Sequence, residues 1–369
     1  MKKKILFCTP FDLSTGSGIA RWANHIYEFY NKIEYPSVNI DIYPMDRKIY
    51  LDETVNIFKR AYLGIKDYSQ IVKGICYKVL NEQYDMVHIA SSASISLVKD
   101  LFLLRKLKSY GVESIIHFHF GRIPELYASK NWEWKLLCRV AKLATKVIVI
   151  DKSSYDTLID AGFSNAYLLP NPLTPQIKDI VSRHQDIPRT ENSLLFVGHV
   201  YRTKGVYELV EVCSEIPQIH LTIIGKYDDE VKNELLNIAS KKGYKSWIEF
   251  TGNISFEEVV KEMIACSIFV LPTYTEGFPN VILESMACAC PIITTNVGAI
   301  PEMLDTANGK DYGLCISPQN KEELKSAISL LLNNKEYALQ CGRNAQKRVY
   351  EMYSIQKVWE QMFQIWINS

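Results

Sequence analysis

The sequence lacks an uninterrupted apolar segment long enough to span a bilayer. Its N-terminal Met-Lys-Lys-Lys precedes a short apolar run, but Thr9, Pro10 and Asp12 end that run too early for a secretory signal peptide. The nine cysteines are odd in number, scattered and without zinc-ligand spacing, which favours reduced thiols over a disulfide framework. We therefore expect a cytoplasmic protein.

The chain also lacks a strong net charge. Its formal charge is +1 and its isoelectric point is near 7.5, and without a basic stripe a nucleic-acid partner is not expected. Hydrophobic residues make up 47% of the chain and charged residues 22%, proportions typical of globular proteins. A length of 369 residues exceeds what one ordinary core accommodates and predicts two domains.

The small net charge hides an asymmetry between the halves. Residues 1–170 hold 23 Lys and Arg against 17 Asp and Glu, whereas the remainder holds 19 against 24. The first half is therefore +6 and the second −5. A basic lobe that faces an anionic surface or ligand is one interpretation, and two solvated surfaces without a partner is the other.

Short apolar, β-branched runs alternate with helical patterns along the whole chain. Such runs occur at 4–8, 38–42, 86–89, 114–118, 146–150, 166–169, 193–197, 220–224, 247–251, 267–271, 291–295 and 313–316. The alternation predicts an α/β protein with parallel sheets, in two Rossmann-like, doubly wound lobes facing a cleft. We expect an N-terminal lobe over 1–170, a linker over 171–190, a C-terminal lobe over 191–350 and a terminal helix over 351–369.

The most informative stretch is Glu276-Gly-Phe-Pro-Asn-Val-Ile-Leu-Glu284. It follows a strand-like run and leads into a helix expected over 280–288, so it forms a strand-to-helix corner, where α/β proteins usually bind ligands. Pro279 suits the first helical position, and the free N–H groups of that turn can accept an anion. Sugar hydroxyls are the donors that the two carboxylates could engage.

This stretch, continuing to Gly298, Pro301 and Glu302, resembles the signature of the retaining family-4 glycosyltransferases of the GT-B fold. The resemblance implies a nucleotide diphosphate sugar, most often UDP-linked, as donor, with no metal required. It implies that Glu276 contacts the transferred sugar and Glu284 the ribose. It also implies that the last helix crosses back onto the N-terminal lobe.

A second motif, Gly198-His-Val-Tyr-Arg-Thr-Lys-Gly205, ends the first strand of the second lobe. Cations at a strand end would stabilise the charge that develops on a departing diphosphate. Lys204 matches the lysine of the resembled family, but His199 stands where that family usually has arginine. Arg202 could supply the second cation, protonated His199 could do so, or Lys204 could act alone; a plain surface turn is the structural alternative.

Two first-lobe segments are further candidates. Gly16-Ser-Gly18 opens a helix as a glycine-rich loop would, although Arg21 replaces the third glycine of a dinucleotide fingerprint. His117 and His119 share one face of a strand and could chelate a metal, but no carboxylate or cysteine motif completes a site. The resemblance places a histidine near the donor sugar and acceptor, a role that His119 fits better, with His117 as a buried strand histidine.

The resulting candidate site combines residues from both lobes. We expect Glu276, Lys204, Arg202 and His119 to act in catalysis. The expected donor-binding residues are Gly16, Ser17, Gly18, Gly198, His199, Arg202, Lys204, Ile254, Glu276, Gly277, Phe278, Pro279, Asn280, Val281 and Glu284.

Three segments of the first lobe, 58–62, 101–108 and 132–146, are both basic and aromatic or apolar. They could rest on anionic lipid at the inner face of the cell membrane, or simply cover a sheet. Acceptor choice is expected in loops 46–57 and 121–134.

The sequence therefore predicts a glycosyltransferase that acts on a glycan or lipid-linked acceptor in cell-surface polysaccharide assembly. An epimerase or phosphorylase of the same fold, or a non-catalytic sugar-binding protein, are the alternatives. An epimerase would release free nucleotide without an acceptor, and a phosphorylase would depend on inorganic phosphate. A binding protein would take free sugar without nucleotide.

Overall fold

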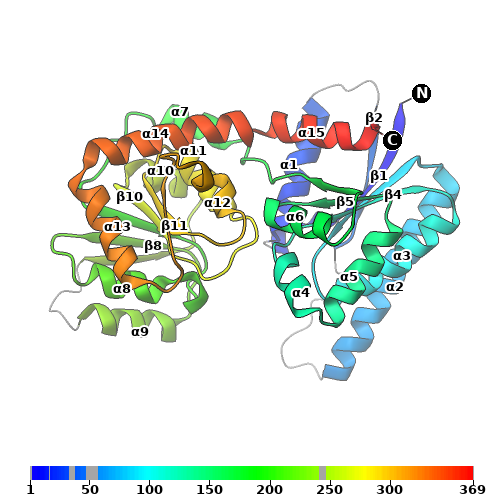
Figure 1. The fold of residues 1–369 in the computed structure, drawn as a ribbon, viewed down its shortest axis with the longest axis horizontal. Helices are drawn as coiled ribbons and strands as arrows, with labels where there is room; N and C mark the ends of the chain where they lie inside the picture. The colour runs from blue at the N-terminus through cyan, green and yellow to red at the C-terminus, as the bar shows by residue number, and fades with distance from the viewer. Residues whose placement is uncertain (1, 16, 33–37, 47–56, 241–246, 369) are drawn as a thin grey trace. The chain divides into compact units, whose positions relative to one another are not determined.

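The computed structural model describes residues 2–368 apart from 16, 33–37, 47–56 and 241–246 (Figure 1). The chain divides into two compact units. Unit 1 comprises Met1–Pro170 and Trp359–Ser369, and unit 2 comprises Asn171–Val358.

Unit 1 is built on a six-stranded parallel sheet in the order β2-β1-β3-β4-β5-β6, flanked by helices (Figure 1). Its strands are β1 (Lys3–Thr9), β2 (Val38–Pro44), β3 (Met86–Ser91), β4 (Glu113–Phe118), β5 (Lys146–Val149) and β6 (Ala166–Leu168). Its helices are α1 (Gly18–Lys32), α2 (Ile57–Glu82), α3 (Ser96–Ser109), α4 (Ile123–Ser129), α5 (Trp132–Leu143) and α6 (Lys152–Asp160), with a 3-10 turn, η1 (Leu13–Thr15).

Apolar strands form the centre of unit 1. Leu6, Val87, Ile116 and Val147, one from each of four neighbouring strands, are fully buried and join one core with Leu104 of α3. Continuous β-branched runs suit strands that are covered on both faces, because both sets of alternating side chains are then buried. This is why the period-2 alternation of a half-exposed strand is absent here.

The C-terminal helix α15 (Ile355–Ile367) contributes its last turns to unit 1. Lys3 Nζ donates to the carbonyl of Trp366 at 3.0 Å, and Lys146 Nζ donates to the carbonyls of Ile365, at 2.6 Å, and Asn368. These carbonyls have no partner within a helix, and cations near a helix C-terminus are favourable. Two lysines of the sheet therefore fix the end of the chain.

Unit 2 repeats the parallel architecture in the order β12-β11-β10-β7-β8-β9. Its strands are β7 (Ser193–Val197), β8 (His220–Ile224), β9 (Ile248–Gly252), β10 (Ile268–Leu271), β11 (Ile292–Thr295) and β12 (Leu314–Ile316). Its helices are α7 (Ile177–Arg183), α8 (Val206–Cys213), α9 (Asp229–Ser240), α10 (Phe256–Ala265), α11 (Asn280–Ala287), α12 (Ile300–Met303), α13 (Lys321–Asn333) and α14 (Lys335–Met352), with 3-10 turns η2 (Arg202–Lys204) and η3 (Thr306–Asn308).

The predicted fold class is confirmed: both sheets are parallel and lie among helices, and all twelve predicted strands are present. Two segments differ from expectation. The stretch expected as a linker contains α7 and belongs to unit 2, and the stretch 121–134, expected as a loop, contains α4. Of loop 46–57, residues 47–56 lie outside the described part of the chain.

No helix among the described residues is sufficiently long and apolar to cross a membrane.

Candidate functional site

The turn after β7 places Lys204 at the carboxyl end of the second sheet. Gly205 adopts a φ of +71°, and a Cβ atom there would lie 1.9 Å from the carbonyl oxygen of Pro272, at the end of β10. The amide of Tyr274 donates to the carbonyl of Thr203 at 2.8 Å. Only glycine fits this close approach, so the Arg202–Lys204 turn is held directly against the segment that leads to Glu276.

Lys204 and Glu276 meet in the described structure. Lys204 Nζ lies 2.5 Å from Glu276 Oε1, and the two side chains are 26% and 13% exposed. The residues are 72 positions apart in the chain. Their partial burial reduces the screening that weakens surface ion pairs. The pair places one cation and one carboxylate at a single point on the carboxyl edge of the sheet, where open α/β sheets bind ligands.

The turn that carries Glu276 depends on a second glycine. Gly298 has a φ of +56°, and a Cβ atom there would lie 2.2 Å from the carbonyl oxygen of Glu276. The amide of Ala299 donates to the carbonyl of Gly277 at 2.9 Å. The loop before α12 therefore supports the backbone on which Glu276 stands, which explains structurally why the sequence pattern extends beyond Glu284.

Helix α11 begins at Asn280, so the expectation that Pro279 is the first helical residue is wrong. Pro279 is the N-cap: its φ of −75° would suit a helix, but its ψ of 102° is extended. Val281 and Asn280 occupy the first turn at intermediate exposure, while Phe278 is buried and packs edge-on against Tyr353.

Glu284 is only 7% exposed on α11. Thr174 Oγ1 donates to Glu284 Oε1 at 3.1 Å, and Asn171 Nδ2 donates to Asn280 Oδ1 at 3.3 Å. A buried carboxylate requires such donors. The sequence did not indicate Thr174 and Asn171 as site residues, because the Pro-Asn-Pro stretch beside them is typical of a linker. The only signal available was that two polar residues follow the last strand of the first lobe.

The neighbouring basic residues make other contacts. The Arg202 guanidinium lies 3.9 Å from the centroid of the Tyr207 ring, a cation–π contact, whereas the ring of His199 stacks on that of Tyr201 at 5.6 Å. Both His199 and Arg202 are exposed. Of the three cationic candidates, Lys204 is therefore the one that contacts a glutamate of the motif.

Two further predicted residues flank this edge of unit 2. The amide of Gly198 donates to the carbonyl of Ile224 at 2.9 Å, which ties the ends of β7 and β8 together. Ile254 follows β9 at intermediate exposure. Both lie after strand ends, as the sequence predicts.

The first-lobe candidates belong to unit 1. Ser17 Oγ accepts from the amide of Ala20 at 3.4 Å, so Ser17 caps α1. A Cβ atom at Gly18 would meet nothing within 4 Å, so no described protein atom requires glycine there. Gly16 lies outside the described residues.

His119 lies at the end of β4 against two aromatic rings. Its ring centroid is 4.0 Å from that of His117 and 4.4 Å from that of Trp22. Burial lowers the pKa of His119 to about 3, so its imidazole is neutral at pH 7. One ring nitrogen can then donate a hydrogen bond and the other can accept one.

Among the described residues no group of three or more His, Cys, Asp or Glu side chains is arranged to hold a metal.

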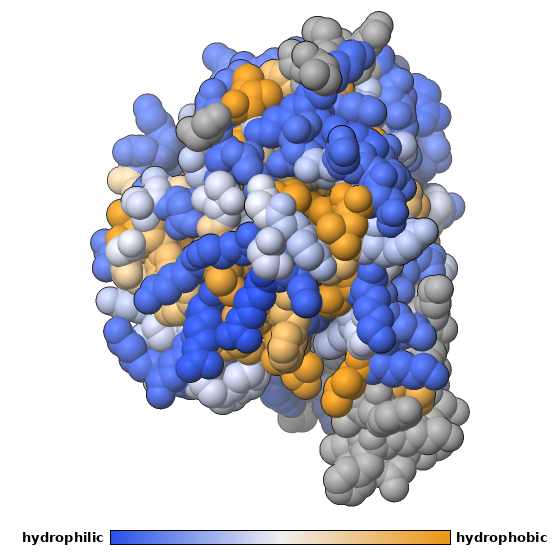
Figure 2. Space-filling view, turned by 90° about the vertical axis from the view of Figure 1, so that its right-hand side faces the viewer, coloured by the Kyte–Doolittle hydropathy of each residue, from blue (hydrophilic) through white to orange (hydrophobic). Residues whose placement is uncertain are grey.

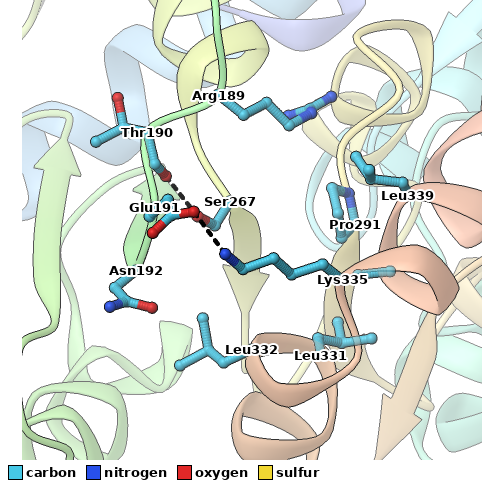
Figure 3. Close-up of a pocket in the computed structure, with 11 residues that line it drawn as sticks. Arg189, Thr190, Glu191, Asn192, Ser267, Pro291, Leu331, Leu332, Lys335 and Leu339 are labelled. Carbon is cyan, nitrogen blue, oxygen red and sulfur yellow. Dashed lines mark hydrogen bonds and ion pairs between the residues drawn. The ribbon is translucent and has the colours of Figure 1, made fainter.

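A cavity of about 140 Å³ lies elsewhere in unit 2. It is lined by Arg189, Thr190, Glu191, Asn192, Ser267, Pro291, Leu331, Leu332, Lys335, Ala338 and Leu339. Figure 3 shows the Lys335 side chain reaching Glu191 beside the lining leucines. Because the residues that immediately precede β7, β10 and β11 line it, this cavity is at the amino ends of the strands, away from the ligand-binding edge.

Comparison with known proteins relates these features to a family. Residues 177–348 match the family model described as "Glycosyl transferases group 1". This range contains Lys204, Glu276 and Glu284.

Individual relatives extend the match. The chain is 27% identical to an uncharacterized glycosyltransferase of Haemophilus influenzae over 84% of this chain and 85% of that protein. It is 29% identical to the capsular polysaccharide biosynthesis glycosyltransferase CapM of Staphylococcus aureus over 45% and 43%. The structure of HepE from Anabaena in complex with UDP aligns with a TM-score of 0.71 over 98% of both chains at 14% identity.

Proposed function

We propose that this chain, which matches the group 1 glycosyltransferase model over residues 177–348 and has the GT-B fold, is a retaining glycosyltransferase of family 4. It transfers a sugar from a UDP-linked donor to a glycan or lipid-linked acceptor in the cytoplasm, in cell-surface polysaccharide assembly. CapM, a relative named for capsular polysaccharide biosynthesis, and HepE, solved with UDP, support the acceptor class and the nucleotide.

The contact between Lys204 and Glu276 carries this proposal. Lys204 Nζ and Glu276 Oε1 lie 2.5 Å apart, so a basic and an acidic group stand together at this edge of the sheet. When the donor binds, Lys204 exchanges the carboxylate for the diphosphate, and Glu276 turns to accept hydrogen bonds from the sugar. The backbone N–H groups of the first turn of α11 complete the anion site, and the buried carboxylate of Glu284 accepts from the ribose hydroxyls.

The chemical step is a front-face displacement. The bond between the anomeric carbon and the diphosphate oxygen breaks with its electron pair remaining on that oxygen, and the acceptor oxygen forms the new bond on the same face. The acceptor proton passes to the departing phosphate oxygen. Lys204 stabilises the charge that grows on the diphosphate, so we propose that the reaction requires no metal. Arg202 or His199 adds a second cation if it leaves its present ring contact.

A transfer assay tests this function. The protein is incubated with UDP-, GDP- and ADP-sugars and with a panel of glycan and lipid-linked acceptors, and nucleotide release and product anomer are followed by NMR. We expect release of UDP that depends on an acceptor, with the donor's anomeric configuration retained. Release without an acceptor would indicate an epimerase, dependence on inorganic phosphate a phosphorylase, and binding of free sugar without nucleotide a sugar-binding protein.

We further propose that unit 1 contacts the membrane through α3 and α5, which pack together. Ile95, Val98 and Phe102 follow one face of α3 with exposed fractions of 67%, 40% and 56%, and Trp132 at the start of α5 is 60% exposed. Figure 2 shows the side of unit 1 that carries α2 and α3, where apolar atoms lie among hydrophilic ones. Apolar and aromatic side chains at this exposure can enter the lipid interface.

The charges of α3 and α5 favour an anionic surface. Their exposed charged residues are all basic, namely Arg105, Lys106, Lys108, Lys135, Arg139 and Lys142, and their acidic residues, Asp100 and Glu133, are buried. Such cations attract anionic lipid by about 1 kcal/mol each. Lys146, expected in the same surface, is instead buried in β5 against the end of α15. The side chains of the segment 58–62 lie outside the described part.

Vesicle sedimentation tests the membrane contact. The protein should sediment with vesicles of anionic phosphatidylglycerol and remain free with neutral phosphatidylcholine. Phe102→Ser together with Trp132→Ser should abolish the sedimentation, whereas Leu80→Ser, at an equally exposed position of α2, should not. If the double variant sedimented with anionic vesicles as much as the wild type does, the proposed membrane surface would be wrong. The proposed transfer reaction would still stand.

A further inference from the structure

Three histidines and two tryptophans form a buried aromatic cluster in unit 1. His88 of β3 and His117 of β4 are fully buried, and their ring centroids lie 5.4 Å apart. Burial lowers the pKa of His88 to about 3 and holds that of His117 well below its ordinary value. Both rings are therefore neutral at pH 7, and each carries one ring proton whose position depends on its hydrogen bonds.

The hydrogen bonds of this cluster have a fixed direction. Trp366 Nε1 lies 2.9 Å from His88 Nδ1, and an indole N–H can only donate. His88 Nδ1 is therefore the acceptor, and the proton of His88 resides on Nε2. That nitrogen lies 3.3 Å from His117 Nδ1, to which it donates. The proton of His117 consequently resides on its own Nε2.

Without Trp366 the direction would be undetermined. Two neutral imidazoles that share one hydrogen bond can point it either way, because either ring can be the donor. The reverse arrangement would place the proton of His117 on Nδ1 and leave a lone pair at Nε2. The donor-only indole of Trp366, on the C-terminal helix, therefore determines whether His117 Nε2 donates or accepts a hydrogen bond.

The end of this chain of hydrogen bonds has no acceptor in the described part of the protein. His117 Nε2 is buried without a hydrogen-bond partner there, and so is Nε1 of Trp22, whose ring packs edge-on against that of His117 at 4.9 Å. Leaving a buried donor unsatisfied costs about 1–3 kcal/mol. Two such donors on touching rings indicate that an oxygen acceptor belongs at this place, beside His119.

We propose that Trp366 is a positioning residue which, through His88, fixes His117 as an Nε2–H donor to an oxygen acceptor. The acceptor is either a buried water or a hydroxyl of the substrate. The second case rests on the proposed function, whereas the tautomers do not. Through Trp366, the C-terminal helix therefore determines that Nε2 of His117, whose ring packs against that of His119, donates rather than accepts.

NMR of the histidine ring nitrogens in the ¹⁵N-labelled full-length protein tests this proposal, with His88→Asn used for assignment. In the wild type, His88 and His117 should each show the Nε2–H tautomer alone. Trp366→Phe removes the directing donor, so the Nδ1–H tautomer of both rings should appear. Nδ1–H at His117 in the wild type, or an unchanged pattern in Trp366→Phe, would overturn the proposal. Once assigned, the wild-type tautomers test the proposed direction of the hydrogen bonds even if Trp366→Phe does not fold.

Trp359→Phe is the matched control. It removes the same volume from the same helix, and the ring of Trp359 packs against those of Phe29, Tyr30 and Trp366. The wild-type tautomers should persist in this variant. A shift of the His117 Nε2–H signal on addition of UDP-glucose and acceptor would identify the substrate as the oxygen source, and an unchanged signal would identify water.

Transfer activity gives a separate readout. If the acceptor is the substrate, the rate should fall about fivefold in Trp366→Phe, as expected for the loss of one hydrogen bond of about 1 kcal/mol, and remain near wild type in Trp359→Phe. Absence of transfer in every variant, with the tautomers as expected, would refute the proposed function and leave the positioning role intact.

Discussion

The two units share an architecture but differ in the chemistry of their candidate residues. In unit 2 these residues are ions: Lys204 pairs with Glu276, and Glu284 is buried with a threonine donor. In unit 1 the titratable candidate, His119, is a neutral ring among other neutral rings. Burial lowers the pKa of all four histidines of unit 1, to about 4 for His25 and about 3 for His88 and His119.

Because of this difference, the two units suit different parts of a ligand. A lysine and carboxylates at the edge of a sheet can bind a ligand that has both negative charge and hydroxyl groups. The nucleotide diphosphate sugar proposed as donor is such a ligand. Buried neutral rings recognise oxygens by single hydrogen bonds and by shape. Changes at individual residues of each unit test whether this division of roles is correct.

Lys204→Met should lower the turnover number by roughly 10²–10³-fold, the usual cost of removing one preorganised electrostatic group. The substitution retains the length of the side chain and removes its charge. Steady-state kinetics with the best donor from the transfer assay measure the effect. Arg202→Met is the matched control, because Arg202 stacks on Tyr207, and it should lose much less. Equal losses would mean that Arg202 leaves the tyrosine to bind phosphate.

Glu284→Gln should raise the KM for the donor by about 10–100-fold, because a hydrogen bond to a charged group contributes roughly 1.5–3 kcal/mol. Thr174→Val removes only the threonine donor to this carboxylate and should raise KM less, by about fivefold. Titration of UDP by calorimetry separates binding from catalysis. A turnover number that falls while UDP affinity stays constant would assign Glu284 to the chemical step instead.

Acidification should unfold unit 1 before unit 2. Because the histidine pKa values in folded unit 1 lie below the ordinary 6.5, the unfolded chain binds more protons between about pH 3 and 6.5. Their contribution is complete above pH 6.5 and is lost as pH falls. Asp151, whose pKa burial raises to about 6, acts oppositely, but four groups outweigh one.

We expect unit 1 to lose on the order of 6 kcal/mol between pH 7 and 5. Five of the six tryptophans belong to unit 1, so urea titrations followed by tryptophan fluorescence report mainly on its unfolding. Far-ultraviolet circular dichroism follows both units together. Coincident loss of both signals at pH 5 would contradict a difference between the units.

Gly298→Ala should destabilise unit 2 by roughly 1–3 kcal/mol, because it combines a positive φ with a Cβ atom 2.2 Å from the Glu276 carbonyl oxygen. Thermal unfolding measures this loss. Gly18→Ala in unit 1 meets no atom within 4 Å and should leave stability nearly unchanged. Reduced donor affinity in Gly18→Ala would then indicate that the ligand, rather than the protein, requires glycine at that position.

Much of the fold could be predicted from the sequence, because buried parallel strands consist of continuous apolar, β-branched runs. The run 193–197 became β7 without a shift of boundary. The helix α4 was missed although its signals were present: Pro124 lies near its start and Glu125 in its first turn. Helix α7 was missed because polar residues between prolines indicated a connection.

The site was predictable to the extent that its residues are adjacent in sequence. The corner from Glu276 to Glu284 is local, so its geometry could be inferred. The contact between Lys204 and Glu276 joins two loops 72 residues apart, and Thr174 reaches Glu284 from 110 residues away. Such contacts depend on strand order and on Gly205 and Gly298, which no spacing rule specifies. The His88–Trp366 bond, across 278 residues, has no sequence signal.

Calorimetric titration of UDP into the wild-type protein, Lys204→Met and Glu284→Gln tests whether the nucleotide binds at this edge of unit 2. We predict that the wild type binds UDP at a single site, and that each variant binds at least tenfold more weakly while melting at a temperature close to that of the wild type. Undetectable binding to the wild type, or equal affinity in all three proteins, would contradict a nucleotide site at the carboxyl edge of the second sheet.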